Sequence, residues 1–162
     1  MVGIRRSALF AAIASVFSTD ATARGSIISK STDQTIVLYN GQCIKSQIAK
    51  GVRSTPGVQT SETAFNCDSM LLTFFPQKGR VLVQFLRKNG SRSPLGFSGE
   101  LENRTTLIID RVYLPQDGSA ILIDEGVCQF GESLASVSSA ICGARIQRGN
   151  VRQAFFVEFR AR

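Results

Sequence analysis

The chain has 162 residues, with 19 Lys+Arg against 12 Asp+Glu, 43% hydrophobic residues, four Cys and no His. This length fits a single domain, and the apolar content is enough to bury a core, which excludes an intrinsically disordered chain. The lack of histidine excludes Ser-His-Asp and Cys-His catalysis and any imidazole-ligated metal.

The N-terminal pattern is typical of a secretory signal peptide. Arg5 and Arg6 precede eleven uncharged residues, 7–17, and an Ala-x-Ala triplet follows at 21–23. A basic, then apolar, then small-residue order marks a cleaved signal, and eleven residues are too few for a transmembrane helix, which needs about 20. We predict a signal peptide over residues 1–23 and a mature domain over residues 24–162. We also predict export to the periplasm or extracellular space, with no transmembrane span.

Short strand patterns separated by turn residues fill the mature chain. Asn89-Gly90 and Asp117-Gly118 supply the positive φ of tight hairpin turns, and residues 153–160 alternate apolar and polar side chains. Residues 80–88 are apolar on both faces, which predicts a central strand. The predicted strands are Thr35–Asn40, Gln42–Ala49, Thr63–Asn66, Met70–Phe75, Arg80–Lys88, Leu95–Leu101, Thr105–Leu114, Ala120–Asp124, Val127–Phe130, Ala140–Gln147 and Gln153–Arg160.

Two stretches lack a strand pattern. Residues 51–61 have no apolar periodicity and are predicted to form a surface loop, and residues 131–139 are predicted to form a short turn of helix. The remainder predicts one all-β domain of about eight to ten antiparallel strands, either a β-sandwich or a small closed β-barrel. The expected core residues are Leu71, Phe74, Val81, Val83, Phe85, Leu107, Ile109, Ile121, Ile123, Phe155, Val157 and Phe159.

The four cysteines predict two disulfides, because an even number of Cys in an exported chain is normally paired. A zinc site needs close pairs such as Cys-x₂-Cys, whereas thirteen residues separate the nearest two, Cys128 and Cys142. We predict Cys43–Cys67 and Cys128–Cys142, since each pair lies on neighbouring strand-like segments. We expect a disulfide-stapled domain without a metal or another cofactor.

The carboxylates give only a weak indication of catalysis. Glu100 and Glu102 share a strand face at i and i+2, the arrangement by which two carboxylates converge in a glycosidase. Beside a turn, such a pair more often forms a solvated polar face. The adjacent Asp110 and Arg111 predict cross-strand ion pairs. No catalytic constellation follows, and we expect a protein that is not an enzyme.

Charge is distributed unevenly along the chain. Residues 24–99 hold ten basic and three acidic side chains, whereas residues 100–162 hold seven and eight, and residues 69–98 contain no acid. Five basic residues bracket the strand predicted at 80–88, so both of its ends should be electropositive and attract anions. Edge charge that only prevents aggregation is the alternative. The candidate anion-binding residues are Lys78, Arg80, Arg87, Lys88 and Arg92.

These patterns favour an exported, non-enzymatic binding or inhibitor module of the bacterial envelope or periplasm. Its expected partner is an anionic envelope component or an acidic protein. We expect no nucleic-acid partner, because aromatic residues do not interleave with the basic ones. One alternative is a structural or assembly component that docks by β-augmentation. The less favoured alternative is a carboxylate-dependent hydrolase using Glu100, Glu102 or Asp124.

Overall fold

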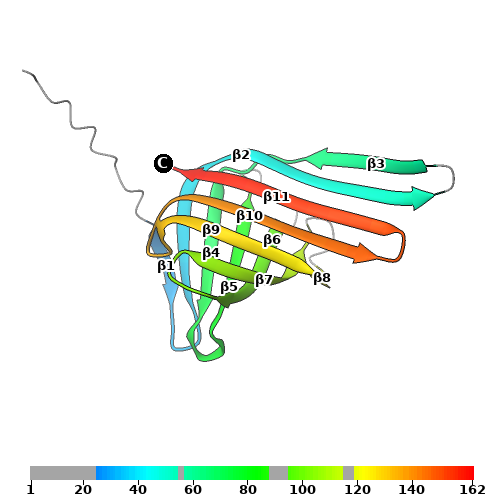
Figure 1. Ribbon diagram of the computed structural model, residues 1–162. Helices are drawn as coiled ribbons and strands as arrows, with labels where there is room; N and C mark the ends of the chain where they lie inside the picture. Colours follow the sequence, from blue (N-terminus) through cyan, green and yellow to red (C-terminus); the bar gives the residue numbers. More distant parts are fainter. Residues whose placement is uncertain (1–24, 55–56, 88–94, 115–118) are drawn as a thin grey trace, which may run out of the picture.

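The computed structural model describes residues 25–54, 57–87, 95–114 and 119–162 (Figure 1). The predicted signal peptide lies outside these residues. So do Lys88, Arg92 and the turns at Asn89-Gly90 and Asp117-Gly118.

The described chain forms one antiparallel sheet of eleven strands and one 3-10 turn, η1 (Pro76–Lys78). Within the described part, no helix is long and apolar enough to cross a bilayer. The strands are β1 (Ser26–Lys30), β2 (Thr35–Ser54), β3 (Gly57–Ala64), β4 (Ser69–Phe75), β5 (Arg80–Leu86), β6 (Leu95–Leu101), β7 (Thr106–Tyr113), β8 (Ala120–Leu122), β9 (Glu125–Ser133), β10 (Ser136–Arg148) and β11 (Val151–Ala161).

Eight of these strands close into an antiparallel barrel in the order β2-β11-β10-β9-β7-β6-β5-β4, and β4 pairs with β2 to complete the ring. Strands β1, β3 and β8 attach outside this ring. The predicted all-β, disulfide-stapled fold is confirmed, and of the two predicted architectures the chain adopts the barrel. As predicted, β5 is central, because it pairs with β4 on one side and β6 on the other.

Strand β2 serves two parts of the molecule. Its first six residues, 35–40, pair with β4 and close the barrel, and its later residues pair with β11 and β3. The second part leaves the barrel with its neighbours as a four-stranded extension in the order β3-β2-β11-β10 (Figure 1). We call this extension the arm and define it as Ala49–Ser54 of β2, Gly57–Glu62 of β3, Arg145–Arg148 of β10 and Val151–Ala154 of β11.

Apolar side chains from all eight barrel strands fill the interior. Phe85 of β5 packs against Phe97 and Phe159, with 6.1 Å between ring centroids in each pair. Near the β9–β10 turn, the buried Tyr39 hydroxyl donates a hydrogen bond of 2.9 Å to the Leu134 carbonyl oxygen, and burial raises the pKa of Tyr39. Of the predicted core, the fully buried members are Val81, Val83, Phe85, Leu107, Ile109, Phe155, Val157 and Phe159.

Both predicted disulfides are confirmed. Cys128 and Cys142 lie directly opposite each other on β9 and β10 and are fully buried. Cys43 of β2 is joined to Cys67, which lies in the segment between β3 and β4, and the Cys43 amide also donates to the Cys67 carbonyl oxygen at 3.0 Å. The two bonds staple β9 to β10 and β2 to the start of β4.

The loop predicted over residues 51–61 is wrong. Strand β2 continues to Ser54, and β3 begins at Gly57 and pairs back along β2. Of the arm residues whose side chains the structure describes, most are exposed or half-buried, so these strands need no apolar alternation. Hydrogen bonding between four adjacent strands holds them instead, and the apolar pattern gives no sign of this pairing.

The helical turn predicted over residues 131–139 is also wrong. β9 ends at Ser133 and β10 begins at Ser136 after a tight turn at residues 134–135, and Glu132, which precedes this turn within β9, has φ 68°. Leu134 and Val137 are buried by this turn. A single helical turn is costly to nucleate, whereas the hairpin buries two apolar side chains.

One residue of β4 was assigned to the wrong face. Leu71 is half-buried, while its neighbours Met70 and Leu72 are fully buried. Because β4 has apolar residues on both faces, its inward face cannot be identified from alternation alone. Three other residues predicted as core are partly buried and pack against the buried core cluster: Phe74, Ile121 and Ile123.

Candidate anion-binding site

The predicted basic residues lie at the two ends of β5. Lys78 ends η1 and Arg80 begins β5, whereas Arg87 follows its last residue. A strand of 7 residues spans about 20 Å, so the structure brings Lys78 and Arg80 together and keeps Arg87 apart. At its own end, the Arg87 guanidinium lies 5.8 Å from the centroid of the Phe65 ring. Lys88 and Arg92 lie outside the described residues.

The η1 turn positions Lys78 beside Arg80. Pro76 occupies the start of the turn, where its fixed φ suits a helical residue. Gly79 ends the turn with φ 62°, and its amide donates to the Pro76 carbonyl oxygen at 3.3 Å. Only glycine adopts such a positive φ without cost. The chain therefore reverses within three residues, and Lys78 projects near the first residue of β5.

Arg80 is held in place by acidic and hydroxyl groups on β6 and β7. Its guanidinium donates to Asp110 Oδ1 at 2.5 Å and to Ser98 Oγ at 3.5 Å, and lies 3.7 Å from Glu100 Oε1. The hydrogen bond to Asp110 raises the pKa of Arg80 further. With 21% of its side chain exposed, Arg80 is a fixed positive charge.

A β-bulge between β6 and β7 brings Asp110 within reach of Arg80. Ser98 pairs with Arg111 and Gly99 pairs with Ile109, so Asp110 is the extra residue. A Cβ on Gly99 would lie 1.8 Å from the Ile108 carbonyl oxygen, so this close approach of the two strands requires glycine. The bulge therefore turns Asp110 toward Arg80.

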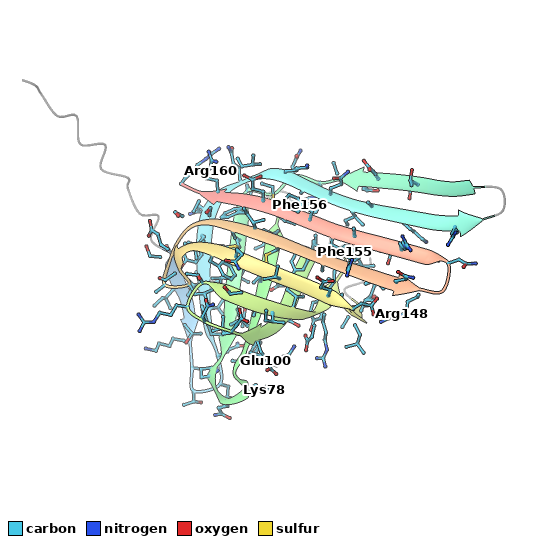
Figure 2. The ribbon with its side chains drawn as sticks, in the orientation of Figure 1. Lys78, Glu100, Arg148, Phe155, Phe156 and Arg160 are labelled. Carbon is cyan, nitrogen blue, oxygen red and sulfur yellow. A yellow bond between two sulfur atoms is a disulfide. The ribbon has the colours of Figure 1, made fainter. Side chains whose placement is uncertain are left out.

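Beside Arg80 the surface forms a hollow of about 210 Å³. Two exposed cations, Lys78 and Arg111, line it, and among the described residues neither has a carboxylate within 4.0 Å. Ser98 and Tyr113 line it too and carry hydroxyl groups. Lys78 and Glu100 are labelled on the lower side of the barrel in Figure 2. This set of cations and hydroxyls suits a phosphate or carboxylate group. We call the hollow that they line the β5 hollow.

Arg111 was not among the predicted anion-binding residues. Its neighbour Asp110 forms an ion pair with Arg80 of β5, two strands away in the sheet. Arg111, for which a cross-strand ion pair was also predicted, has no acidic partner among the described residues. The adjacent Asp110-Arg111 charges were visible in the sequence. Whether each of the two finds an ion-pair partner depends on the β-bulge, and the bulge could not be recognised in the sequence.

The carboxylates of the hydrolase alternative are engaged or scattered. Glu100 belongs to the Arg80 cluster, and Glu102 lies beyond the end of β6. The Asp124 carboxylate accepts hydrogen bonds from the backbone N–H of Gln147 at 2.6 Å and from the Arg148 guanidinium at 2.7 Å. These contacts lower the pKa of Asp124. The general acid of a glycosidase needs a raised pKa, so the contacts of Asp124 do not suit it to that role.

No family model, curated protein or solved structure matches the chain. The candidate site therefore rests on the geometry of this chain alone.

Proposed function

We propose that the protein is an exported, non-enzymatic binding module, and that the β5 hollow receives an anionic group of an envelope component or an acidic protein. The observation that carries the proposal is the convergence of Lys78 and Arg111, which have no acidic partner among the described residues, on the fixed charge of Arg80. The disulfides are compatible with an oxidising, exported location.

Electrostatics favour an anion at this point. Lys78 and Arg111 repel each other and the net charge around them attracts counter-ions. Arg80 already has Asp110 and Glu100, so its guanidinium needs no rearrangement when a ligand binds. An anionic group would offset the two remaining charges and accept hydrogen bonds from lysine, arginine and hydroxyl donors.

The test is titration of the oxidised protein with inorganic phosphate, glycerol phosphate and vesicles of phosphatidylcholine containing phosphatidylglycerol. The double variant Lys78→Gln/Arg111→Gln should bind at least one probe about tenfold or more weakly, since each charged hydrogen bond is stronger than a neutral one. The matched control is Arg87→Gln/Arg160→Gln, which also removes two positive charges but from surfaces away from the hollow.

An equal loss in both double variants would show that only net charge matters and would contradict the proposal. Failure of the wild-type protein to bind any of the three probes would contradict it too. Binding should also weaken with salt, because screening shortens the reach of exposed charges to about 8 Å at physiological ionic strength.

One observation favours assembly by β-augmentation as a second candidate function. Within the described residues, β3 pairs only with β2, so its outer edge has no strand partner. An open edge is a template for a strand from another chain. If this edge serves assembly, Thr60→Pro should abolish co-purification of an envelope partner that the wild type retains, and retention by both proteins would argue against it.

A further inference from the structure

The outer face of the arm carries a second hollow, far larger than the one beside β5. It has a volume of about 730 Å³ and crosses β3, β2, β11 and β10. Its middle is lined by the small residues Ala49, Gly51 and Ala154. Arg145 and Arg152 border it on the β10 and β11 side, and Glu62 borders it on the β3 side. We call it the arm groove.

The strand register places three arginines on one diagonal of this face. Arg145 lies opposite Ala154 on β11, and Arg152 is two residues from Ala154 on the same strand. Arg152 lies opposite Gly51 on β2, and Arg53 is two residues further along β2. Residues two apart on a strand share a face. The Cα atoms of diagonal neighbours on adjacent strands lie about 7–8 Å apart. Arg145, Arg152 and Arg53 therefore lie at regular spacing on one diagonal. Arg145 and Arg152 line the groove, and Arg53 continues the diagonal on the same face beyond the lining residues.

These arginines are available to a ligand. Among the described residues, neither Arg53 nor Arg152 has a carboxylate within 4.0 Å. Arg145 pairs with Glu125, but both side chains are about two-thirds or more exposed, at 73% and 67%. An exposed pair of this kind contributes little and is readily exchanged for another anion. Arg148, labelled at the end of β10 in Figure 2, is engaged by Asp124 and is not counted in the line.

We propose that the arm groove binds a linear acidic polysaccharide with repeating carboxylates. A line of arginines matches a chain of repeating anions, and the guanidinium fork binds a carboxylate through two parallel hydrogen bonds. Without large side chains in its middle, the groove lets sugar rings approach the sheet closely.

The other lining groups fit sugar hydroxyls better than bases. Thr60 and Gln147 bring hydroxyl and amide groups to the groove walls. Two carboxylates also line it, and both are engaged: Glu62 accepts a hydrogen bond from Gln47, and Asp124 pairs with Arg148. None of the described lining residues is aromatic, whereas single-stranded nucleic acid is normally held by stacking on aromatic rings. The chemistry of the groove therefore selects an acidic glycan over a nucleic acid.

The arm groove is independent of the β5 hollow. It is built on β2, β3, β10 and β11, whereas the hollow lies beside η1, β5, β6 and β7, and the two share no lining residue. Either site can therefore be removed by substitution without touching the other.

The experiment is isothermal titration of the oxidised protein with polygalacturonate oligomers, which carry one carboxylate per sugar. We expect binding that Arg53→Gln/Arg152→Gln weakens about tenfold for each arginine removed. Ala154→Phe should also weaken it, because it fills the groove without changing charge. Ala154 is exposed, so circular dichroism and the Tm should show that each variant remains folded.

Three controls separate this site from general electrostatics and from the β5 hollow. Arg87→Gln/Arg160→Gln removes the same charge elsewhere and should leave polygalacturonate binding nearly unchanged. Lys78→Gln/Arg111→Gln should leave it unchanged too, although it weakens binding at the β5 hollow about tenfold or more. Dextran, a neutral glycan, should not bind.

The proposal is overturned if polygalacturonate does not bind, if Arg53→Gln/Arg152→Gln and Arg87→Gln/Arg160→Gln lose equal affinity, or if Ala154→Phe binds as the wild type does. It is also overturned if oligothymidylate binds equally well and with the same dependence on Arg53 and Arg152, because the groove would then recognise any polyanion.

Discussion

Asp124 shows how one side chain protects the edge of a strand. β10 continues beyond the residue opposite the start of β9, where Glu125 pairs with Arg145. The backbone N–H of Gln147 therefore has no partner on β9, and it donates its hydrogen bond to the Asp124 carboxylate instead. Arg148 completes the arrangement by donating to Asp124 and to the Leu122 carbonyl oxygen.

This contact predicts a pH-dependent contribution to stability. The Gln147 amide, and after it Arg148, lower the pKa of Asp124 below its ordinary value of 3.8. The ionised carboxylate therefore stabilises the fold above that value, and this stability is lost as the pH falls through the lower pKa of the folded state. Asp124→Asn should have a lower Tm than the wild type at pH 7, and the difference should shrink as the pH falls below 3.8.

Thermal unfolding at a series of pH values measures this difference. Glu102→Gln is the matched control, because it removes the same charge from an exposed side chain for which no ion pair occurs among the described residues. A pH-independent difference between Asp124→Asn and the wild type would contradict the assigned role of the carboxylate.

At the scale of elements, the two disulfides differ more in burial than in loop length. Cys128–Cys142 closes a sequence separation of 14 and is fully buried, whereas Cys43–Cys67 closes 24 and includes the partly buried Cys43. Loop entropy alone gives each bond about 3 kcal/mol, slightly more for the longer loop. Packing favours the opposite order, because removing buried atoms leaves a cavity.

We therefore predict that Cys128→Ala/Cys142→Ala destabilises the protein more than Cys43→Ala/Cys67→Ala does, with a loss of about 3–5 kcal/mol in the first case. Urea denaturation of both double variants measures the two free energies of unfolding. The reverse order would show that loop entropy outweighs packing at these sites.

The sequence was informative where an element buries one face or closes locally. Both cysteine pairs and the alternating strand of Phe155, Val157 and Phe159 were predicted correctly, because burial and short separation appear in the residue pattern. The hairpin of β2 and β3 was missed because its pairing is backbone hydrogen bonding between accessible strands. Residues 131–139 were misassigned because their small polar side chains favour no element strongly.

The candidate site was predictable only in part. Lys78 and Arg80 are neighbours in sequence and remain neighbours in the fold. Arg111 joins them from a strand two places away in the sheet, through a register that the bulge at Gly99 shifts by one residue. Such a shift reverses which side chains share a face, and it leaves no sign in composition or periodicity.

At the scale of the whole molecule, the closed barrel carries charged side chains on its outer surface. Its interior is filled by side chains such as Phe85, Phe97 and Phe159. The β5 hollow and the arm groove therefore lie on outer faces, on strands held in the closed ring or continuous with it. Both proposals follow from cations that strand register brings together. Among the described residues, Lys78 and Arg111 at the hollow and Arg53 and Arg152 on the arm have no carboxylate within 4.0 Å.

The most direct test of the proposed binding function is a titration of the isotope-labelled protein with inorganic phosphate, followed by nuclear magnetic resonance of backbone amides and arginine side chains. The shift changes should saturate and concentrate at Lys78, Arg80, Ser98, Arg111 and Tyr113. They should be small at Arg87, at the other end of β5. Changes spread evenly over all exposed arginines and lysines, or absent from the hollow, would contradict the proposed binding function.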